Sequence, residues 1–294
     1  MFKLAIVLTA SMLAAACARE LETATPVFPD MPAPTQNSRA YGLTESPDGA
    51  VRVFAQEDYG NTNLFYSLKT GDEWSAPQKL DVPARKTATS PSFSPVNGHL
   101  YFSSDAAVDD LPGRKDLNIW QLPRENGSWG VATPLPVGNV NTGANELSPA
   151  IDGNGVLYYA STHSRTGFHG SNIVSSSPQP DGDWTFETPF GLVNDDRANE
   201  HLAVTKDGQM IFFYSHRRPK FGSTDIWVSK RGESGDWNPP ERLGKTVNST
   251  AIEFGAGLSS DNKTFFFSRD GQLMQIDLNA ALANLGEPVD TDEK

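Results

Sequence analysis

The sequence predicts an all-β protein, a five-bladed β-propeller whose blades are four-stranded antiparallel sheets and whose ring is closed by an N-terminal strand. Three observations predict it. A tryptophan segment recurs at a fixed period, Asp-Gly or Asn-Gly turns separate apolar stretches, and an N-terminal segment resembles the strand missing from the last repeat. The tryptophans lie 55, 55 and 53 residues apart, at Trp74, Trp129, Trp184 and Trp237. A period of this length is typical of propellers and other repeat architectures.

Each repeat begins with a strand, a tight turn and an aromatic, β-branched second strand. An Asp-Gly or Asn-Gly turn between apolar alternations is the strongest short-range hairpin signal. The five turns read SPDG, PVNG, DGNG, KDGQ and SDNK, and they occupy residues 46–49, 95–98, 152–155, 206–209 and 260–263. The first two strands of every blade are therefore expected to form a hairpin.

A variable loop and a third strand follow, and the tryptophan segment leads into the fourth strand. The third strands read NLFYS, NIWQL, NIVSS, DIWVS and LMQID. The prolines of segments such as SGDWNPPERL suit an outer edge strand, where a missing N–H leaves no ladder bond unmade. We expect the tryptophans to pack between blades.

The fifth repeat ends without a tryptophan strand, since LNAALANLGEPVD follows its third strand. Residues 23–28 resemble the Thr-Pro segments of the second and third repeats, VATPLP and ETPF. We therefore expect them to supply the fourth strand of the last blade, which would remove an exposed sheet edge. The partial fifth repeat argues against four blades, and a sixth would need about 50 further residues.

The most complete repeat resembles the WD-like repeats of TolB-type propellers. The resemblance lies in NEHLAVTKDGQMIFFYSHRR, STDIWVSKRG and GDWNPPERLG, and it extends over residues 39–277. It departs from the pattern in the first repeat, where Tyr41 stands in place of Glu. The resemblance implies a binding scaffold or lipoprotein of the bacterial envelope, although some hydrolases and lyases share such repeats.

The charge balance excludes one class of partner. The chain has 294 residues, of which 36 are acidic and 24 are basic, with a net charge of −12. Nucleic-acid affinity depends on Lys and Arg that neutralise phosphates. We therefore expect no nucleic-acid partner, and an apolar fraction of 37% favours a folded monomeric domain.

The N-terminus predicts export. Lys3 precedes a short apolar run over residues 4–13 and a small-residue stretch that ends in Cys17, the one cysteine of the chain. This is the pattern of a signal peptide, and the run is shorter than the roughly 20 apolar residues of a membrane-spanning helix. We assign residues 1–16 to the signal peptide, 17–22 to a tether and 23–294 to the propeller.

Cys17 resembles the lipidated cysteine of bacterial lipoproteins. Ala14 stands where that signal prefers Leu, and Ala18 resembles the outer-membrane sorting pattern. The expected location is the periplasm, with a lipid anchor in the outer membrane as the sole membrane contact. The alternative is ordinary signal cleavage after Ala16 or Ala18, with Cys17 unmodified.

Function is expected on the face with long loops. Segments leading into the first strands and those joining the second and third strands lie at one end of a propeller, and residues 105–116, 162–171 and 216–224 are long and irregular. Two of these loops concentrate cations and histidines, and the ligand-binding candidates among them are Arg165, His169, His216 and Arg217. Arginine forks hold carboxylates well, which suggests an acidic sugar such as a uronate or sialic acid. Alternatively, the arginines pair with carboxylates of the blades.

Three glutamates are further candidates. Glu146, Glu200 and Glu253 lie 54 and 53 residues apart, near the start of successive first strands. Carboxylates that converge on an axis can form a cation site or an acid–base pair. The structural alternative is that each accepts hydrogen bonds from backbone donors of the neighbouring blade.

These features predict a non-enzymatic binding or scaffold module of the cell envelope, with an envelope protein or an anionic glycan as partner. The alternative is a carbohydrate-active enzyme, a glycoside hydrolase or polysaccharide lyase acting on an anionic glycan, because fold does not decide function. No catalytic residue is assigned. No cofactor or metal is expected, since the sequence has no nucleotide-binding fingerprint and its histidines lack zinc-site spacing.

Overall fold

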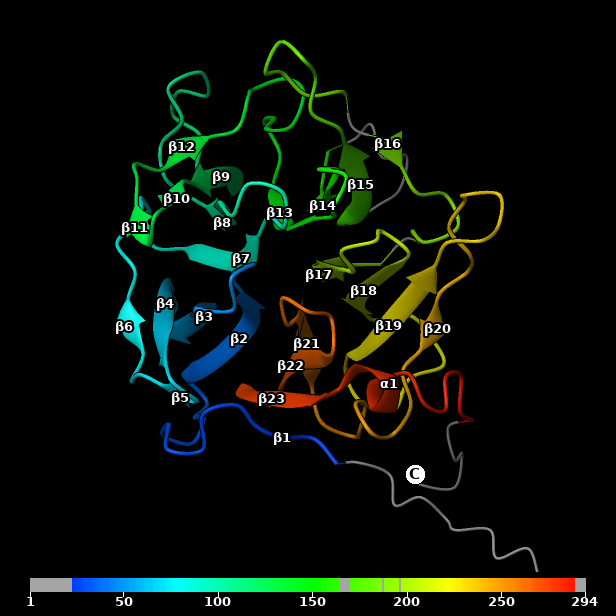
Figure 1. The fold of residues 1–294 in the computed structure, drawn as a ribbon. Coiled ribbons are helices and arrows are strands. Elements are labelled where there is room, and N and C mark those ends of the chain that lie inside the picture. The colour runs from blue at the N-terminus through cyan, green and yellow to red at the C-terminus, as the bar shows by residue number, and fades with distance from the viewer. Residues whose placement is uncertain (1–22, 164–169, 187, 196, 289–294) are drawn as a thin grey trace, which may run out of the picture.

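The computed structural model describes residues 23–163, 170–186, 188–195 and 197–288, and they form five antiparallel sheets around a central axis (Figure 1). The predicted five-bladed propeller is confirmed. The signal peptide, the tether and Cys17 lie outside the described residues, as do Arg165 and His169. Among the described residues no helix is long and apolar enough to cross a membrane.

Blades 1 to 3 follow one another along the chain. Blade 1 contains β2 (Ser38–Glu45), β3 (Val51–Asp58), β4 (Asn61–Thr70), β5 (Glu73–Trp74) and β6 (Gln78–Lys79). Blade 2 contains β7 (Ala88–Phe93), β8 (Leu100–Ser104), β9 (Asn118–Leu122) and β12 (Thr133–Pro134), with a small ribbon of β10 (Arg124–Glu125) and β11 (Ser128–Trp129). Blade 3 contains β13 (Glu146–Ile151), β14 (Leu157–Ser161), β15 (Asn172–Ser176) and β16 (Thr188–Pro189).

Blades 4 and 5 complete the ring. Blade 4 contains β17 (Asn199–Val204), β18 (Met210–Ser215), β19 (Asp225–Lys230) and β20 (Glu241–Arg242). Blade 5 contains β21 (Glu253–Leu258), β22 (Thr264–Arg269), β23 (Gln272–Asp277) and β1 (Thr25–Pro26). The innermost strands are β2, β7, β13, β17 and β21 (Figure 1).

The N-terminal strand closes the ring as predicted. Thr25 pairs with Gln275 and Pro26 with Met274, and the Val27 N–H donates to the Leu273 carbonyl at 2.9 Å. The paired strand spans two residues, which is shorter than the expected range of 23–28. The C-terminal end of blade 5 instead turns into the short helix α1 (Leu278–Ala281), which Asp277 caps by accepting hydrogen bonds from two backbone N–H groups.

Trp129 and Trp237 pack between blades, as expected, but they precede the fourth strands instead of belonging to them. Trp237 of blade 4 meets Tyr158 and Phe190 of blade 3, with ring centroids 6.1 and 5.7 Å apart. Trp129 of blade 2 meets Tyr66 of blade 1 at 6.4 Å. The ladder bonds of the fourth strands are made a few residues later, for example by Thr133–Pro134 of β12.

Each innermost strand contains a β-bulge with one residue at positive φ. The five register shifts follow Tyr41, Thr89, Leu147, Glu200 and Phe254. The positive-φ residue comes next each time, at Gly42, Ser90, Ser148, His201 and Gly255. A bulge bends the strand and re-aims the side chains beside it, so these positions form a ring of irregular backbone around the axis.

The ring has two ends, the hairpin face and the loop face. The hairpin face carries the turns between the first and second strands and between the third and fourth strands. The loop face carries the segments that lead into the first strands and the connections from second to third strands. On the loop face, blades 2, 3 and 4 have the long connections, whereas Tyr59-Gly60 and Asp270-Gly271 close blades 1 and 5 as tight turns.

Candidate functional site

A cavity of about 250 Å³ opens on the loop face at the axis. Its walls come from blades 1, 4 and 5 and include Arg39, Tyr41, Glu57, His201, His216 and Phe254. Deeper along the axis lie a constriction of about 10 Å³, which His201 also lines, and a pocket of about 80 Å³ at the hairpin face. His201 therefore stands between the loop-face cavity and the constriction.

The bulge of β17 brings His201 to the axis, where it stands at φ 52° and packs among aromatic rings. The imidazole stacks on Tyr41 with centroids 5.1 Å apart and planes 10° apart, and Tyr214 meets it edge-on at 5.1 Å. The backbone N–H of His201 donates to Ser148 Oγ of blade 3 at 2.9 Å. Stacking and this backbone bond hold the ring across the channel.

His201 is neutral near pH 7. Burial lowers its pKa to about 4 from an ordinary value of 6.5, while the charge of Glu200 partly opposes the shift. Its Nδ1 atom is buried and has no hydrogen-bond partner among the described residues. The floor of the cavity is thus an uncharged aromatic surface with one unused polar atom.

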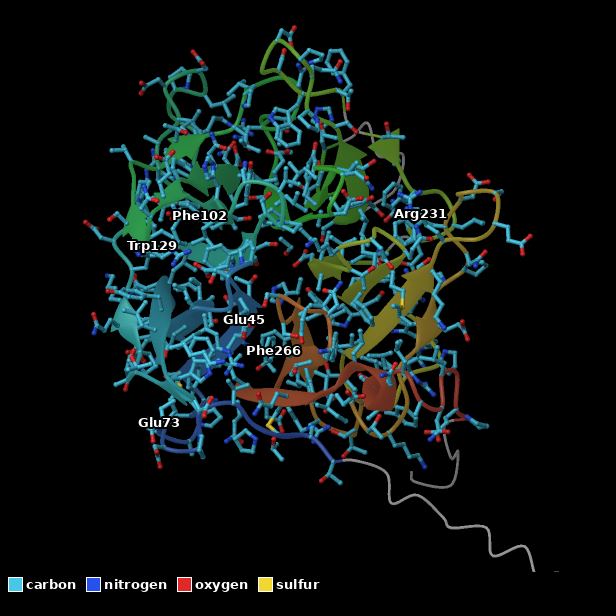
Figure 2. The ribbon with its side chains drawn as sticks, viewed as in Figure 1. Glu45, Glu73, Phe102, Trp129, Arg231 and Phe266 are labelled. Carbon is cyan, nitrogen blue, oxygen red and sulfur yellow. The ribbon has the colours of Figure 1, made fainter. Side chains whose placement is uncertain are left out.

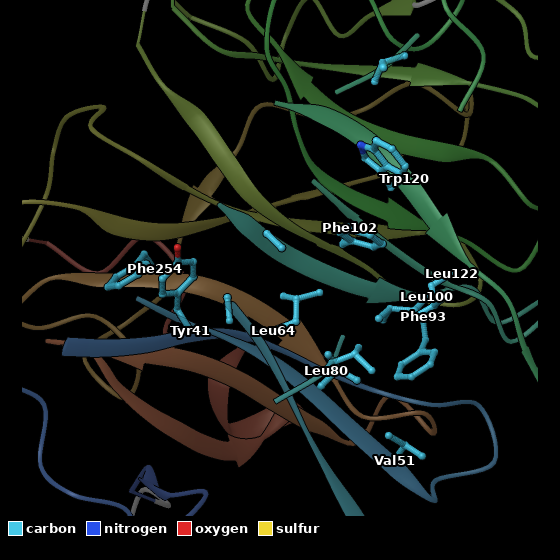
Figure 3. Packing of buried hydrophobic residues seen from close by; sticks show 14 residues of the cluster. Tyr41, Val51, Leu64, Leu80, Phe93, Leu100, Phe102, Trp120, Leu122 and Phe254 are labelled. Atoms are coloured by element: carbon cyan, nitrogen blue, oxygen red, sulfur yellow. The ribbon is translucent and has the colours of Figure 1, made fainter. Parts of the chain in front are cut away.

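Phe254 and Tyr41 form a second side of the cavity. Their rings lie side by side in Figure 3, with centroids 5.3 Å apart. Above Phe254 the Arg39 guanidinium lies 6.0 Å from the ring centroid, and its Nε donates to Glu57 at 2.7 Å. The hydrogen bond to Glu57 raises the pKa of Arg39. Half of the Arg39 side chain is exposed at the rim.

His216 contributes a second polar group to the cavity. Its Nδ1 lies 3.3 Å from the Ser223 carbonyl, which accepts hydrogen bonds only, so Nδ1 carries the proton. In the neutral ring Nε2 is then an acceptor. His216 is exposed, and its ring meets Tyr214 edge-on at 5.9 Å.

Glu200 supports the cavity from behind. Tyr214 Oη donates to one carboxylate oxygen at 3.1 Å, and Ser171 Oγ of the blade 3 loop donates to the other. Burial and the neighbouring carboxylate raise the pKa of Tyr214. Glu200 thus fixes Tyr214 in the wall and ties blade 4 to the loop of blade 3.

The three glutamates do not occupy equivalent strand positions, although their spacing of 54 and 53 residues suggested that they do. Glu146 pairs with Ser161 and Glu253 with Arg269, and the matching pair in blade 4 is Asn199 with Ser215. Glu200 lies one residue further along. Since successive side chains of a strand point to opposite faces, it serves a different surface.

Glu146 and Glu253 are fully buried and do not line the cavity. Glu146 accepts from the N–H and hydroxyl of Thr142 at 3.0 and 2.6 Å. Glu253 accepts from the N–H and hydroxyl of Ser249 and from Arg269 Nε at 3.0 Å. Each carboxylate thus holds the segment that leads into its own strand.

Arg217 lies away from the cavity and is 9% exposed. Its Nη2 donates to the Val193 carbonyl at 2.6 Å and to Asn199 Oδ1 at 2.7 Å, and its guanidinium lies over the Phe213 ring. Arg269 makes the matching bond to the Val247 carbonyl at 2.7 Å. The same arginine contact thus occurs in blades 4 and 5, where it holds the segment that precedes each blade. The structure therefore brings His216 to the cavity but not Arg217.

Sequence reasoning missed most of the cavity. Arg39, Glu57, Tyr214 and Phe254 carry no local motif, and they meet only because blades 1, 4 and 5 surround the axis. The single signal available was the departure of Tyr41 from the repeat pattern. Among the described residues no group of three or more His, Cys, Asp or Glu is placed to hold a metal ion.

No protein-family model matches the sequence, and a comparison with curated proteins finds no match. Solved structures do match. A putative TolB from Agrobacterium tumefaciens is 17% identical, with a TM-score of 0.50 over 84% of this chain and 79% of that one. At this sequence identity the match shows a shared fold only. The resemblance to TolB-type propellers is thereby confirmed for the architecture.

Carbohydrate-active enzymes share the same architecture. A thermostable family-43 glycoside hydrolase is 14% identical, with a TM-score of 0.51 over 82% of this chain and 89% of that one. Another glycoside hydrolase is 8% identical, with a TM-score of 0.52 over 92% and 91% of the two chains. The same fold therefore occurs in a TolB and in glycoside hydrolases, and it does not decide the function of this chain.

Proposed function

We propose that this chain is a non-enzymatic binding module of the bacterial cell envelope and that its ligand docks over the axial cavity of the loop face. The observation that carries the proposal is the cavity itself, which is concave, largely aromatic and edged by a few polar groups. Binding sites for organic ligands have this composition. Because its walls lie on or beside the innermost strands of three blades, the cavity is preformed.

The rim favours an acidic group on the ligand. Arg39 Nε is bound to Glu57, and the Nη atoms of Arg39 have no hydrogen bond with the described residues. A guanidinium with two free nitrogens can grip a carboxylate with parallel hydrogen bonds. An acidic segment of an envelope protein or a uronate-type glycan fits this chemistry, with its apolar part against Tyr41 and Phe254.

The carboxylates around the cavity favour binding over hydrolysis. Most glycoside hydrolases use two carboxyl groups about 5 to 9.5 Å apart across the scissile bond. Among the described lining residues Glu57 alone has a carboxylate, and it is paired with Arg39 at 2.7 Å. The enzymatic alternative would need a second carboxyl group, supplied by a loop of the loop face.

The test is a thermal-shift screen of acidic oligosaccharides, including oligogalacturonate and sialyllactose, followed by titration of any hit. Arg39→Ala with His216→Ala should weaken binding at least about tenfold, since the charge-assisted contact of Arg39 alone contributes about 1.5 to 3 kcal/mol. Lys79→Ala, an exposed cation of β6, serves as the control. Undiminished binding by the double variant would place the ligand elsewhere. Cleaved glycan in the same samples would show that the protein is a carbohydrate-active enzyme.

Export and lipid anchoring belong to the same proposal and rest on the N-terminal sequence. Cys17→Ser should release the protein into the soluble envelope fraction or leave it unprocessed. The measurement is fractionation, with mass analysis of the N-terminal peptide. Wild-type protein that is fully soluble and carries no acyl chain would show that Cys17 is not an anchor.

A further inference from the structure

A second cleft, of about 510 Å³, lies on the hairpin face between blades 2 and 3. Its lining includes Asn97, Tyr101 and Gln121 of blade 2 and Pro178 and Trp184 of blade 3. It is at the opposite end of the ring from the axial cavity, so what binds there is independent of the proposed function.

Trp184 differs from the other blade tryptophans in its cross-strand partner. Trp74 faces Lys69, Trp129 faces Arg124 and Trp237 faces Arg231, whereas Trp184 faces Pro178. The three cations lie 5.9, 6.0 and 4.5 Å from the centroids of their rings. Among the described residues no cation lies over Trp184. Blade 3 therefore lacks a contact that the other three tryptophan-bearing blades make internally.

Arg231 shows what that contact contributes. Besides stacking on Trp237, its guanidinium donates from Nη2 to Tyr158 Oη of blade 3 at 3.0 Å and from Nη1 to the Gly235 carbonyl at 2.7 Å. Arg231 and Trp129 are labelled in Figure 2, at the outer parts of blades 4 and 2. One side chain thus links two blades through a ring face and a phenol oxygen.

Tyr101 occupies in blade 2 the position that Tyr158 occupies in blade 3. Tyr101 pairs with Ser92, the second residue after the bulge residue of β7, and Tyr158 pairs with Ala150, the second after that of β13. The Tyr101 hydroxyl has one long hydrogen bond, from Asn97 Nδ2 at 3.5 Å. The tryptophan face and phenol oxygen that hold Arg231 between blades 3 and 4 are thus both present between blades 2 and 3, without an arginine.

We propose that this cleft binds an arginine side chain of a partner protein, which stacks on Trp184 and donates a hydrogen bond to Tyr101 Oη. The cleft lining carries no positive charge, and Asp181 and Asp183 stand beside Trp184 on the same hairpin. The net charge of −12 attracts a cationic segment to the surface. A planar guanidinium suits a ring face and a hydroxyl better than an ammonium does.

The probe is the peptide acetyl-Gly-Gly-Arg-Gly-Gly-amide, with a twin in which citrulline replaces arginine. Citrulline keeps the size and the planar group but has no charge. Binding to the full chain is followed through the indole N–H signals, with that of Trp184 assigned from Trp184→Phe. We expect the arginine peptide to shift the Trp184 signal and the citrulline peptide to bind about tenfold more weakly.

Two variants test the geometry. Pro178→Arg should fill the cleft from within, as Arg231 does in blade 4, so that it raises the melting temperature and abolishes peptide binding. Tyr101→Phe removes only the acceptor oxygen and should weaken binding about fivefold. Equal binding of the two peptides, or unchanged binding by folded Pro178→Arg, would overturn the proposal. So would a neutral oligosaccharide such as cellohexaose that shifts the Trp184 signal while the arginine peptide does not.

Discussion

At the scale of single residues, the positive φ of His201 explains the shape of the cavity better than its residue type does. His201 stands where the other innermost strands have Gly or Ser, and its positive φ points an imidazole across the channel. A polar ring packed among Tyr41, Tyr214 and Phe254 is kept uncharged, because this packing removes part of the hydration that would stabilise a positive charge. Stability should therefore depend on its titration.

The first prediction concerns pH. The folded pKa of His201 is about 4 and the ordinary value is 6.5, so between these values the unfolded state binds the proton and the folded state does not. The free energy of unfolding should fall as pH drops from 6.5 to 4, by at most about 3 kcal/mol, and this loss should level off below pH 4. Urea titrations at pH 7, 5 and 4 measure it. His201→Phe, which keeps the ring but cannot titrate, should show a smaller loss over this range, and an identical loss would contradict the assignment.

The second prediction concerns Arg231. Arg231→Ala removes a cation–π contact and the hydrogen bonds to Tyr158 and the Gly208 and Gly235 carbonyls. We expect the free energy of unfolding to fall by about 2 to 3 kcal/mol. Lys69→Ala is the matched control, because Lys69 is exposed and lies 5.9 Å from its ring. Chemical denaturation of both variants should separate them, and equal losses would show that Arg231 is not a link between blades.

At the scale of strands, the sequence predicted the hairpins and third strands well because turn chemistry and apolar alternation are local. The prediction failed for Glu200, because its position depends on the register of strand pairing. The spacing of 54 and 53 residues pointed to Glu200, but the bulges and the segments before each strand place Asn199 opposite Ser215. Single-residue register depends on pairing between strands, which no residue count shows.

Close packing of the innermost strands gives the third prediction. A Cβ atom on Gly257 of β21 would lie 1.9 Å from the Leu43 carbonyl oxygen of β2. Gly257→Ala should therefore separate blades 5 and 1 and lower the melting temperature strongly, at a cost of several kcal/mol. Gly191→Ala is the control, since no atom lies within 4 Å of its added Cβ, and its effect should stay within about 1 kcal/mol. Similar melting temperatures for the two variants would contradict the close contact.

At the scale of the whole molecule, the repeat period and the incomplete last repeat were enough to predict five blades and the strand that closes them. The loop-face cavity could not be predicted in the same way. Tyr41, His201 and Phe254 come from three blades, and they meet only because closure of the ring brings the first blade next to the fifth. Among the site residues proposed from sequence that the structure describes, His216 alone lines that cavity.

The fourth prediction concerns closure. Deleting residues 21–30 removes β1 and the packing of Phe28 on Phe54, whose ring centroids are 5.5 Å apart. The outer edge of β23 would then be unpaired, and exposed edges recruit other chains. We expect a lower melting temperature together with oligomers on size-exclusion chromatography. A monomeric deletion variant with the wild-type melting temperature would show that β1 is dispensable.

The pairing of Thr25 with Gln275 also governs the order in which the ring can be completed as the chain emerges into the compartment where it folds. The partners are 250 residues apart, so β1, the first of the described strands in the chain, is the last to find its place. Contacts of such separation close slowly. Until β23 has emerged, residues 25 and 26 have no sheet to join and the nascent ring has two open edges. Because β1 and β23 lie in one blade, a circular permutant that links residue 288 to residue 23 and opens the chain at 191 should form the same ring while changing which blade is completed last.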